Sequence, residues 1–356
     1  MKNVIISCFW LLIISACSVS NVKFEITQPA EINIPNHIES IIIVNRTSPT
    51  KKNKLENILD GIFSGETIGV DKQSSRDCIN ALKLELEHSP KFDLLSTTPT
   101  ELKGSGTSEM SQPLKWEKIE QTFSGLQADG LIVLESFDSS SQFRELGTRE
   151  KRKKRDGKQK IIIEHIASLE VEVFSGWRIY DITNKKILDE KIFIDRKVFE
   201  AVDETMGLAK QSLPGLGSAI SEAAILSGQQ FYQRISPHQS TIKREYFKNL
   251  RHISGFKIKS DNSNDLFVKA SEFVLNQYWQ EAVKIWKQFV DSKNKEIASR
   301  ACFNIALASE VNNSIDIALF WAKKSLNLGN SKAQQYVNQL EKRNLDLDKL
   351  EKQLLK

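Results

Sequence analysis

The sequence predicts an α+β fold: an N-terminal mixed α/β sheet domain with covering helices, followed by an α-helical repeat domain. Before residue 250, short β-branched runs alternate with segments of helical periodicity. Beyond residue 262 the helical period continues to the C-terminus. There Ala282 and Ala318 lie thirty-six residues apart, a spacing that indicates repeated helical pairs.

The first sixteen residues have the features of a signal peptide. Lys2 gives a positive start, and the apolar run over residues 4–14 is too short to span a bilayer. An Ile-Ser-Ala tripeptide directly before Cys17 is typical of a lipobox, where a cysteine is acylated before cleavage. We therefore expect a lipoprotein signal peptide over residues 1–16, lipidation at Cys17 and a lipidated tether over residues 17–37 that attaches the chain to a membrane.

Export also bears on location and on the remaining cysteines. Ser18, rather than an acidic residue, follows Cys17, which favours the outer membrane with the protein facing the periplasm. An oxidising compartment would permit a disulfide between Cys78 and Cys302. Each of these cysteines has apolar neighbours in an expected helix, which favours two buried free thiols instead.

Residues 38–250 are expected to form the mixed α/β domain, in the order strand, helix, strand, helix, strand, hairpin, helix. The patterns predict these elements over residues 40–45, 72–88, 92–95, 116–123, 130–136, 169–181 with 187–194, and 201–234.

A basic run interrupts the strand patterns of this domain and is predicted to be a hairpin tip or a long loop. Its contact patch consists of Arg149, Lys151, Arg152, Lys153, Lys154 and Arg155. This patch could meet anionic lipid head groups, meet an acidic partner, or simply be solvated. The net charge of +5 is too small and too local for a general nucleic-acid binder, so no nucleic-acid partner is expected.

The C-terminal domain over residues 262–343 is expected to consist of two helical pairs and a capping helix, followed by a helical tail over residues 344–356. The run from Asn304 to Ala308, followed by Ala318, resembles a tetratricopeptide repeat. The resemblance implies that Ala318 lies where two helices cross, and we expect Glu310 to be exposed. Such repeats either bind a partner protein or pack on the sheet domain.

The whole chain resembles a family of Bacteroidota envelope lipoproteins with C-terminal tetratricopeptide-like repeats. The resemblance depends on the lipobox, the C-terminal repeats and four short segments, which are residues 41–46, 65–69, 235–237 and 244–246. The N-terminal half is also similar in element order to envelope lipoproteins related to curli-secretion and penicillin-binding-protein activator subunits. Neither resemblance implies a particular activity.

The sequence carries no nucleotide-binding, metal-binding or nucleophile motif, so we expect no catalytic residues, no cofactor and no metal. The favoured hypothesis is a lipid-anchored, non-enzymatic protein-interaction or assembly module of the cell envelope. The alternative is an envelope hydrolase with its active site in the α/β domain, favoured by the long loops at residues 47–71 and 96–113.

Overall fold

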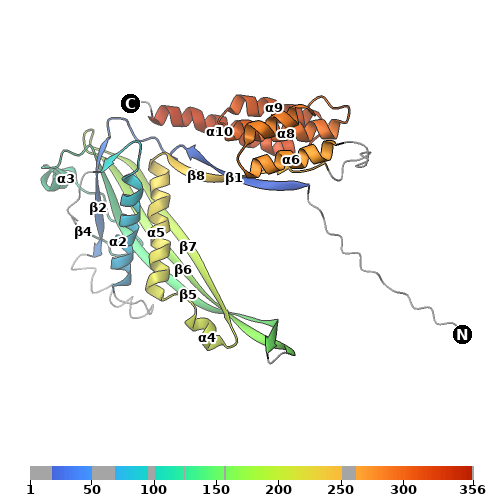
Figure 1. Ribbon diagram of the computed structural model, residues 1–356. Coiled ribbons are helices and arrows are strands. Elements are labelled where there is room, and N and C mark those ends of the chain that lie inside the picture. The colour runs from blue at the N-terminus through green and yellow to red at the C-terminus, as the bar shows by residue number, and fades with distance from the viewer. Residues whose placement is uncertain are drawn as a thin grey trace. The chain divides into compact units, whose positions relative to one another are not determined.

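The computed structural model describes residues 18–49, 69–94, 101–123, 125–155, 158–250 and 262–354 (Figure 1). The signal peptide, Cys17 and most of the loop at residues 47–71 lie outside the described residues. The chain forms a sheet unit, residues 29–238 with the last five residues, and a helical unit, residues 239–351 with the N-terminal segment up to Gln28. The α+β class is confirmed, but the division lies near residue 238 rather than between residues 250 and 262.

The sheet unit is built on one six-stranded sheet with the path β3–β2–β5–β6–β7, and β4 pairs with β2 (Figure 1). The strands are β2 (Ser40–Pro49), β3 (Asp93–Leu94), β4 (Glu101–Gly104), β5 (Gly130–Arg155), β6 (Lys158–Asp181) and β7 (Lys186–Asp203). β2 runs parallel to β3, β4 and β5, whereas β5, β6 and β7 form an antiparallel meander. The basic run is therefore paired strand, because β5 and β6 continue as a ladder to Arg155 and Lys158.

Helices cover both faces of this sheet. On the inner face, α2 (Val70–Leu86) and α5 (Leu216–Ile235) pack over a core that includes Val171, Val173 and Trp177. On the outer face, α3 (Trp116–Phe123) covers the alternate residues of β2 and β5. A short helix, α4 (Met206–Gln211), packs against β6 and β7.

α2 and α5 approach each other closely because α5 is rich in small residues. A Cβ atom on Gly228 would lie 2.1 Å from the carbonyl oxygen of Cys78, so only glycine fits at this crossing. Cys78 is buried there as a free thiol, and Cys302 is also a buried free thiol in the helical unit. The expectation of two free thiols is confirmed.

Two bulges set the faces of β5. Leu134 pairs with Trp177 and Ser136 with the adjacent Gly176, so Glu135 is an extra residue in the ladder. A second irregularity leaves Leu146 unpaired. The first bulge directs Glu135 and Ser136 to the outer face, between the inward-facing side chains of Leu134 and Phe137.

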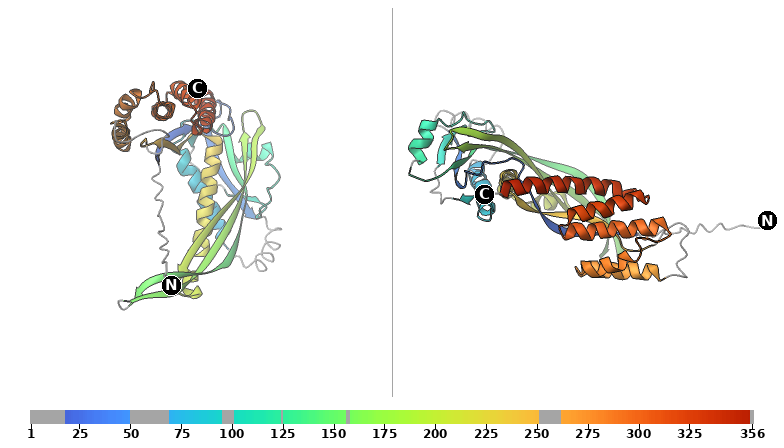
Figure 2. Two further views of the ribbon diagram at one scale, coloured as in Figure 1. Left: turned by 90° about the vertical axis from the view of Figure 1, so that its right-hand side faces the viewer. Right: turned by 90° about the horizontal axis from the view of Figure 1, so that it is seen from above.

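The described residues of the helical unit form five helices and a two-stranded ribbon (Figure 2). The helices are α6 (Ser263–Leu275), α7 (Trp279–Lys287), α8 (Lys295–Val311), α9 (Ile315–Asn327) and α10 (Lys332–Leu354). The capping helix and the tail are thus one continuous helix. The ribbon pairs β1 (Val19–Gln28) with β8 (His238–Phe247). The tether prediction is wrong for β1, since alternate residues of this strand, Val22 and Phe24 among them, pack on the helical core.

The two helical hairpins share one register. α6 packs on α7, α7 on α8, and α8 on α9. Residues thirty-six apart occupy equivalent places in the two hairpins. Three such pairs are buried, namely Phe267 and Phe303, Ala270 and Ala306, and Ala282 and Ala318. A fourth pair, Gln277 and Asn313, lies in the turns. Gln277 and Asn313 have φ angles of 62° and 56°, so both hairpins turn through a left-handed residue. Among the described residues, no helix is long and apolar enough to cross a membrane.

Candidate functional site

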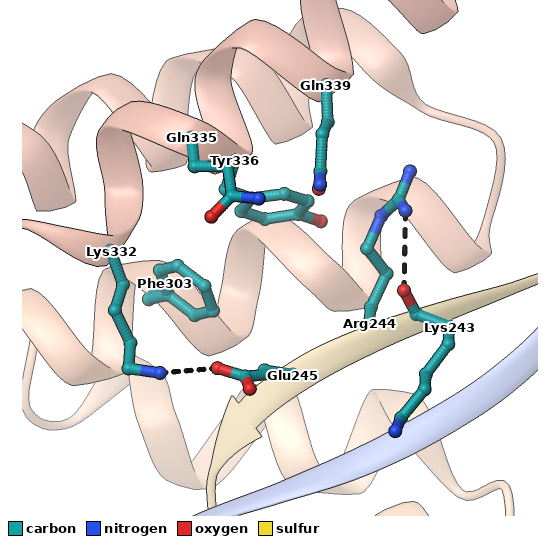
Figure 3. Close-up of a pocket in the computed structure, with 8 residues that line it drawn as sticks. All are labelled: Lys243, Arg244, Glu245, Phe303, Lys332, Gln335, Tyr336 and Gln339. Atoms are coloured by element: carbon teal, nitrogen blue, oxygen red, sulfur yellow. Dashed lines mark hydrogen bonds and ion pairs between the residues drawn. The ribbon is translucent and has the colours of Figure 1, made fainter.

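A cavity of about 270 Å³ opens on the helical unit where β8, α8 and α10 meet (Figure 3). Its lining combines cationic, acidic, amide and aromatic side chains, which are Lys243, Arg244, Glu245, Phe303, Lys332, Gln335, Tyr336 and Gln339. The four α10 residues follow a spacing of three or four, so they share one face of that helix. We refer to this cavity as the interaction pocket.

The floor of the interaction pocket is held by a buried ionic cluster. Arg244 donates two hydrogen bonds to Glu310, from Nη2 to Oε1 at 2.8 Å and from Nε to Oε2 at 3.0 Å. The hydroxyl of Tyr336 donates to Oε2 of the same carboxylate at 2.8 Å. Burial and the charge of Glu310 raise the pKa of Tyr336 well above its ordinary value. The expectation that Glu310 is exposed is wrong, because only 3 % of it is accessible.

The rim of the interaction pocket supplies groups suited to a polar, elongated ligand. Lys332 pairs with Glu245 at 2.5 Å, whereas Lys243 forms no ion pair with any described residue. Gln335 and Gln339 line the pocket together with the rings of Phe303 and Tyr336 (Figure 3). Primary amides donate to and accept from a peptide backbone, and an ammonium group attracts a carboxylate.

The contact patch of the sheet unit is divided between the two faces of the β5–β6 hairpin. Arg149 and Lys151 lie on the outer face and both donate to Glu164 at 2.9 Å. On the same face Lys153 pairs with Glu204 at 3.0 Å. Arg152 pairs across the ladder with Ile161, and with Lys154 it lies on the inner face. The placement of the Arg155 side chain lies outside the described part of the chain.

The patch therefore offers less free charge than its sequence suggests. The hydrogen bond from Lys151, followed by that from Arg149, lowers the pKa of Glu164, which stays ionised as their counter-ion. Only Arg152 and Lys154, of the patch side chains that the structure describes, have no ion pair with another described residue. Ile161 and Ile163, exposed by 62 % and 58 %, share their face.

A second buried ionic cluster fixes the loop before α3 to the outer face of the sheet. Glu135, fully buried, accepts from Arg46 and from Arg178, each at 2.7 Å, and from Tyr180 at 2.8 Å. Arg46 also donates to the carbonyl of Gln112 at 2.7 Å. Burial, followed by the charge of Glu135, raises the pKa of Tyr180 to about 12. Because each charged group of this cluster is paired with another described residue, the cluster holds the loop before α3 against the sheet.

A polar group beneath α5 contains a thiol but is closed to solvent. Ser175 and Ser227 share a hydrogen bond of 2.5 Å, and Trp177 donates to Ser175 at 3.1 Å. Burial and the nearby Asp195 raise the pKa of Cys78, so the thiol stays protonated at neutral pH. A protonated, buried thiol is not a nucleophile. In the described ranges, no group of three histidine, cysteine or acidic residues could hold a metal ion.

Sequence reasoning did not find the interaction pocket. Its residues come from three segments, around 243, 303 and 332–339, and only the fold brings them together. The segment Arg244–Tyr246 was singled out by resemblance, and Arg244 does belong to the floor. The loop predictions that favour a hydrolase fall partly on residues 50–68 and 95–100, which lie outside the described residues.

Comparison with known families decides where the chain belongs. Residues 38–247 match a family model described as a domain of unknown function, DUF8603. The chain belongs to that family. Residues 268–342 match a second domain of unknown function, DUF6340, which covers the helical hairpins. No curated protein sequence matches the chain.

Two solved structures have distant likeness to this member of the DUF8603 family. One is a neuraminyllactose-binding hemagglutinin homolog from Helicobacter pylori, 13 % identical over 57 % of this chain and 86 % of that one, with a TM-score of 0.25. The other is the hypothetical protein CT253 from Chlamydia trachomatis, 12 % identical over 55 % of this chain and 95 % of that one, with a TM-score of 0.21. Likeness at these scores carries no argument about function.

Proposed function

We propose that the protein is a lipid-anchored, non-enzymatic interaction module of the cell envelope, attached through Cys17, and that the interaction pocket binds an extended, acidic segment of a partner protein. The lipobox supports the anchor, and the outer membrane facing the periplasm is the proposed location. The shared thirty-six-residue register of the two hairpins supports tetratricopeptide-like repeats, a class that presents concave surfaces to peptides.

The proposed binding role depends on one observation. The residues at the floor of the pocket are fixed by buried hydrogen bonds, whereas the polar side chains at its rim are adaptable. Arg244, Glu310 and Tyr336 are locked together and cannot reorganise without breaking buried charge-assisted hydrogen bonds. The amides of Gln335 and Gln339 line the pocket beside this cluster and suit a peptide backbone. The ammonium group of Lys243, which has no ion pair with a described residue, points away from these amides and is available to a carboxylate outside the rim (Figure 3). A preformed site of this kind binds without first ordering its own floor.

The proposal is tested by photo-crosslinking in native membranes. A photoreactive residue at Gln339 should give one discrete crosslinked protein, and one at exposed Lys287 on α7 should not. Adding Lys243→Glu should abolish the crosslink, because an acidic segment would then be repelled. Adding Lys323→Glu, which alters an exposed lysine of α9, should leave the crosslink intact.

A crosslink that survives Lys243→Glu would contradict an acidic ligand. Absence of any discrete crosslink from Gln339 would reject the pocket as the binding site. Thermal melting of each variant, expected to match that of the wild type, separates lost binding from lost folding.

A further inference from the structure

β7 is a long edge strand whose outer edge is unpaired among the described strands (Figure 1). It is eighteen residues long and hydrogen-bonds to β6 on one side only. Every second N–H and C=O group of such a strand points to the free edge and can pair with another strand. Two of its apolar side chains, Ile192 and Ile194, are 47 % and 61 % exposed on the outer face.

The charges along β7 are antisymmetric about Phe193. The segment from Asp189 to Lys197 reads Asp-Glu-Lys-Ile-Phe-Ile-Asp-Arg-Lys. When this segment is placed antiparallel to itself with Phe193 on the two-fold axis, every charged residue lies opposite a residue of the other sign. The resulting pairs are Asp189 with Lys197, Glu190 with Arg196, Lys191 with Asp195, Ile192 with Ile194, and Phe193 with itself.

We propose that β7 pairs antiparallel with β7 of a second copy of this chain, about a two-fold axis at Phe193, to form one continuous sheet across a homodimer. A two-fold interface is self-complementary, so the same pairs occur twice. Opposite charges directly across an antiparallel pair stabilise it, and like charges destabilise it. Ile192 and Ile194 would each cover the other on the outer face.

The alternative is that these charges protect the edge from pairing. Edge strands are commonly blunted by lysines and by inward-pointing charges. A protective pattern would place like charges opposite each other when the strand meets its own copy, since that is the most abundant partner. β7 shows the reverse pattern at all three charged positions on each side of Phe193.

The existing contacts of β7 are compatible with the added strand. Asp189 pairs with Arg234 and Lys197 with Glu222, both on α5. Across β6, Glu190 pairs with Arg178 and Arg196 with Glu172. A second copy would extend these pairs into longer ladders. Asp195 also has a buried Oδ2 atom with no hydrogen-bond partner among the described residues. Lys191 of the second copy would be its cross-strand neighbour.

Disulfide trapping of the full chain tests the axis. In a background with Cys8 and Cys17 changed to serine, only two buried thiols remain in the chain. Phe193→Cys should crosslink with its own copy, since paired Cα atoms lie about 4.5–5.5 Å apart and a disulfide spans that distance. Glu190→Cys and Arg196→Cys should each stay uncrosslinked alone but should crosslink when mixed.

Sedimentation of the full chain tests the dimer itself. The wild type should sediment as a dimer, and Ile194→Lys should sediment as a monomer with unchanged circular dichroism. Ile163→Lys, an equally exposed isoleucine on β6, should remain dimeric. A wild-type monomer at every soluble concentration, a dimer that survives Ile194→Lys, or failure of Phe193→Cys to crosslink would each overturn the proposal.

Discussion

The side-chain amide of Asn304 hydrogen-bonds both backbone groups of Phe247. Asn304 Nδ2 donates to the carbonyl of Phe247 at 2.7 Å, and Asn304 Oδ1 accepts from its N–H at 2.8 Å. Asn304 is fully buried in α8, and Phe247 ends β8. The Asn304 side chain thus makes the two backbone hydrogen bonds that a neighbouring strand would make at the end of β8. It connects the β1–β8 ribbon to the helices.

Asn304→Ala is therefore expected to destabilise the helical unit. It leaves a buried N–H and a buried C=O unpaired, each costing about 1–3 kcal/mol. The measurement is the shift in denaturation midpoint, together with faster hydrogen exchange at the Phe247 amide. Asn338→Ala on the exposed face of α10 is the control and should change neither. Unchanged exchange at Phe247 in the Asn304 variant would contradict the assigned role.

Ala318→Leu should also destabilise the helical unit. Ala318 is fully buried in α9, as is Ala282 thirty-six residues earlier, so a larger side chain at Ala318 would press on the residues that enclose it. Overpacking of this kind typically costs about 1–3 kcal/mol. Thermal melting should show the loss, while Lys323→Ala at an exposed ion pair should change the melting temperature little. Equal melting of the two variants would argue against a tight helix crossing.

Ionisation of Tyr180 should lower the unfolding free energy of the sheet unit at alkaline pH. Its pKa is raised to about 12 in the folded state from 10.0, so the neutral form is favoured by folding. The stabilisation is complete below pH 10 and is lost as the pH rises toward 12, by roughly 1.4 kcal/mol at pH 11.

In Tyr180→Phe the difference in unfolding free energy between pH 8 and pH 11 should shrink by that amount. Comparing two pH values within each protein cancels the constant cost of the missing bond to Glu135. A difference identical to that of the wild type would mean that Tyr180 ionises freely in the fold.

Cys17→Ala should release the protein from the membrane fraction. The expectation follows from the tripeptide and cysteine that end the short apolar run. Stable membrane attachment needs more than one acyl chain, and an acylated Cys17 would carry those chains. Fractionation and metabolic labelling with a fatty acid provide the measurement. Continued labelling of the variant would show that Cys17 is not the modified residue.

Much of the fold could be predicted from the sequence because burial imposes regular periods. The helices from α6 to α9 repeat small and aromatic residues at fixed spacing, and the buried strand at residues 40–45 is a β-branched run. β1 was missed because its alternation is weak, and because its partner β8 is more than two hundred residues away.

The candidate sites could not be predicted because their groups meet only in the folded chain. Arg244, Glu310 and Tyr336 belong to three separate elements, and Glu310 looks like a surface residue in its helical pattern. Glu135 follows four apolar residues and interrupts a strand period, but only the ladder shows that it is an extra residue directed at Arg46 and Arg178.

The two extra residues of β5 together determine on which face of the sheet each later side chain of the strand lies. Each single insertion exchanges the two faces of the strand, so Glu135 and Leu146 in succession restore the original alternation before the basic end of the hairpin. If Leu146 were instead paired in a regular ladder, every later residue of β5 would shift by one position, and Arg149 and Lys151 would be turned away from Glu164. The counter-ion of the basic end thus depends on a bulge at an uncharged residue three positions away.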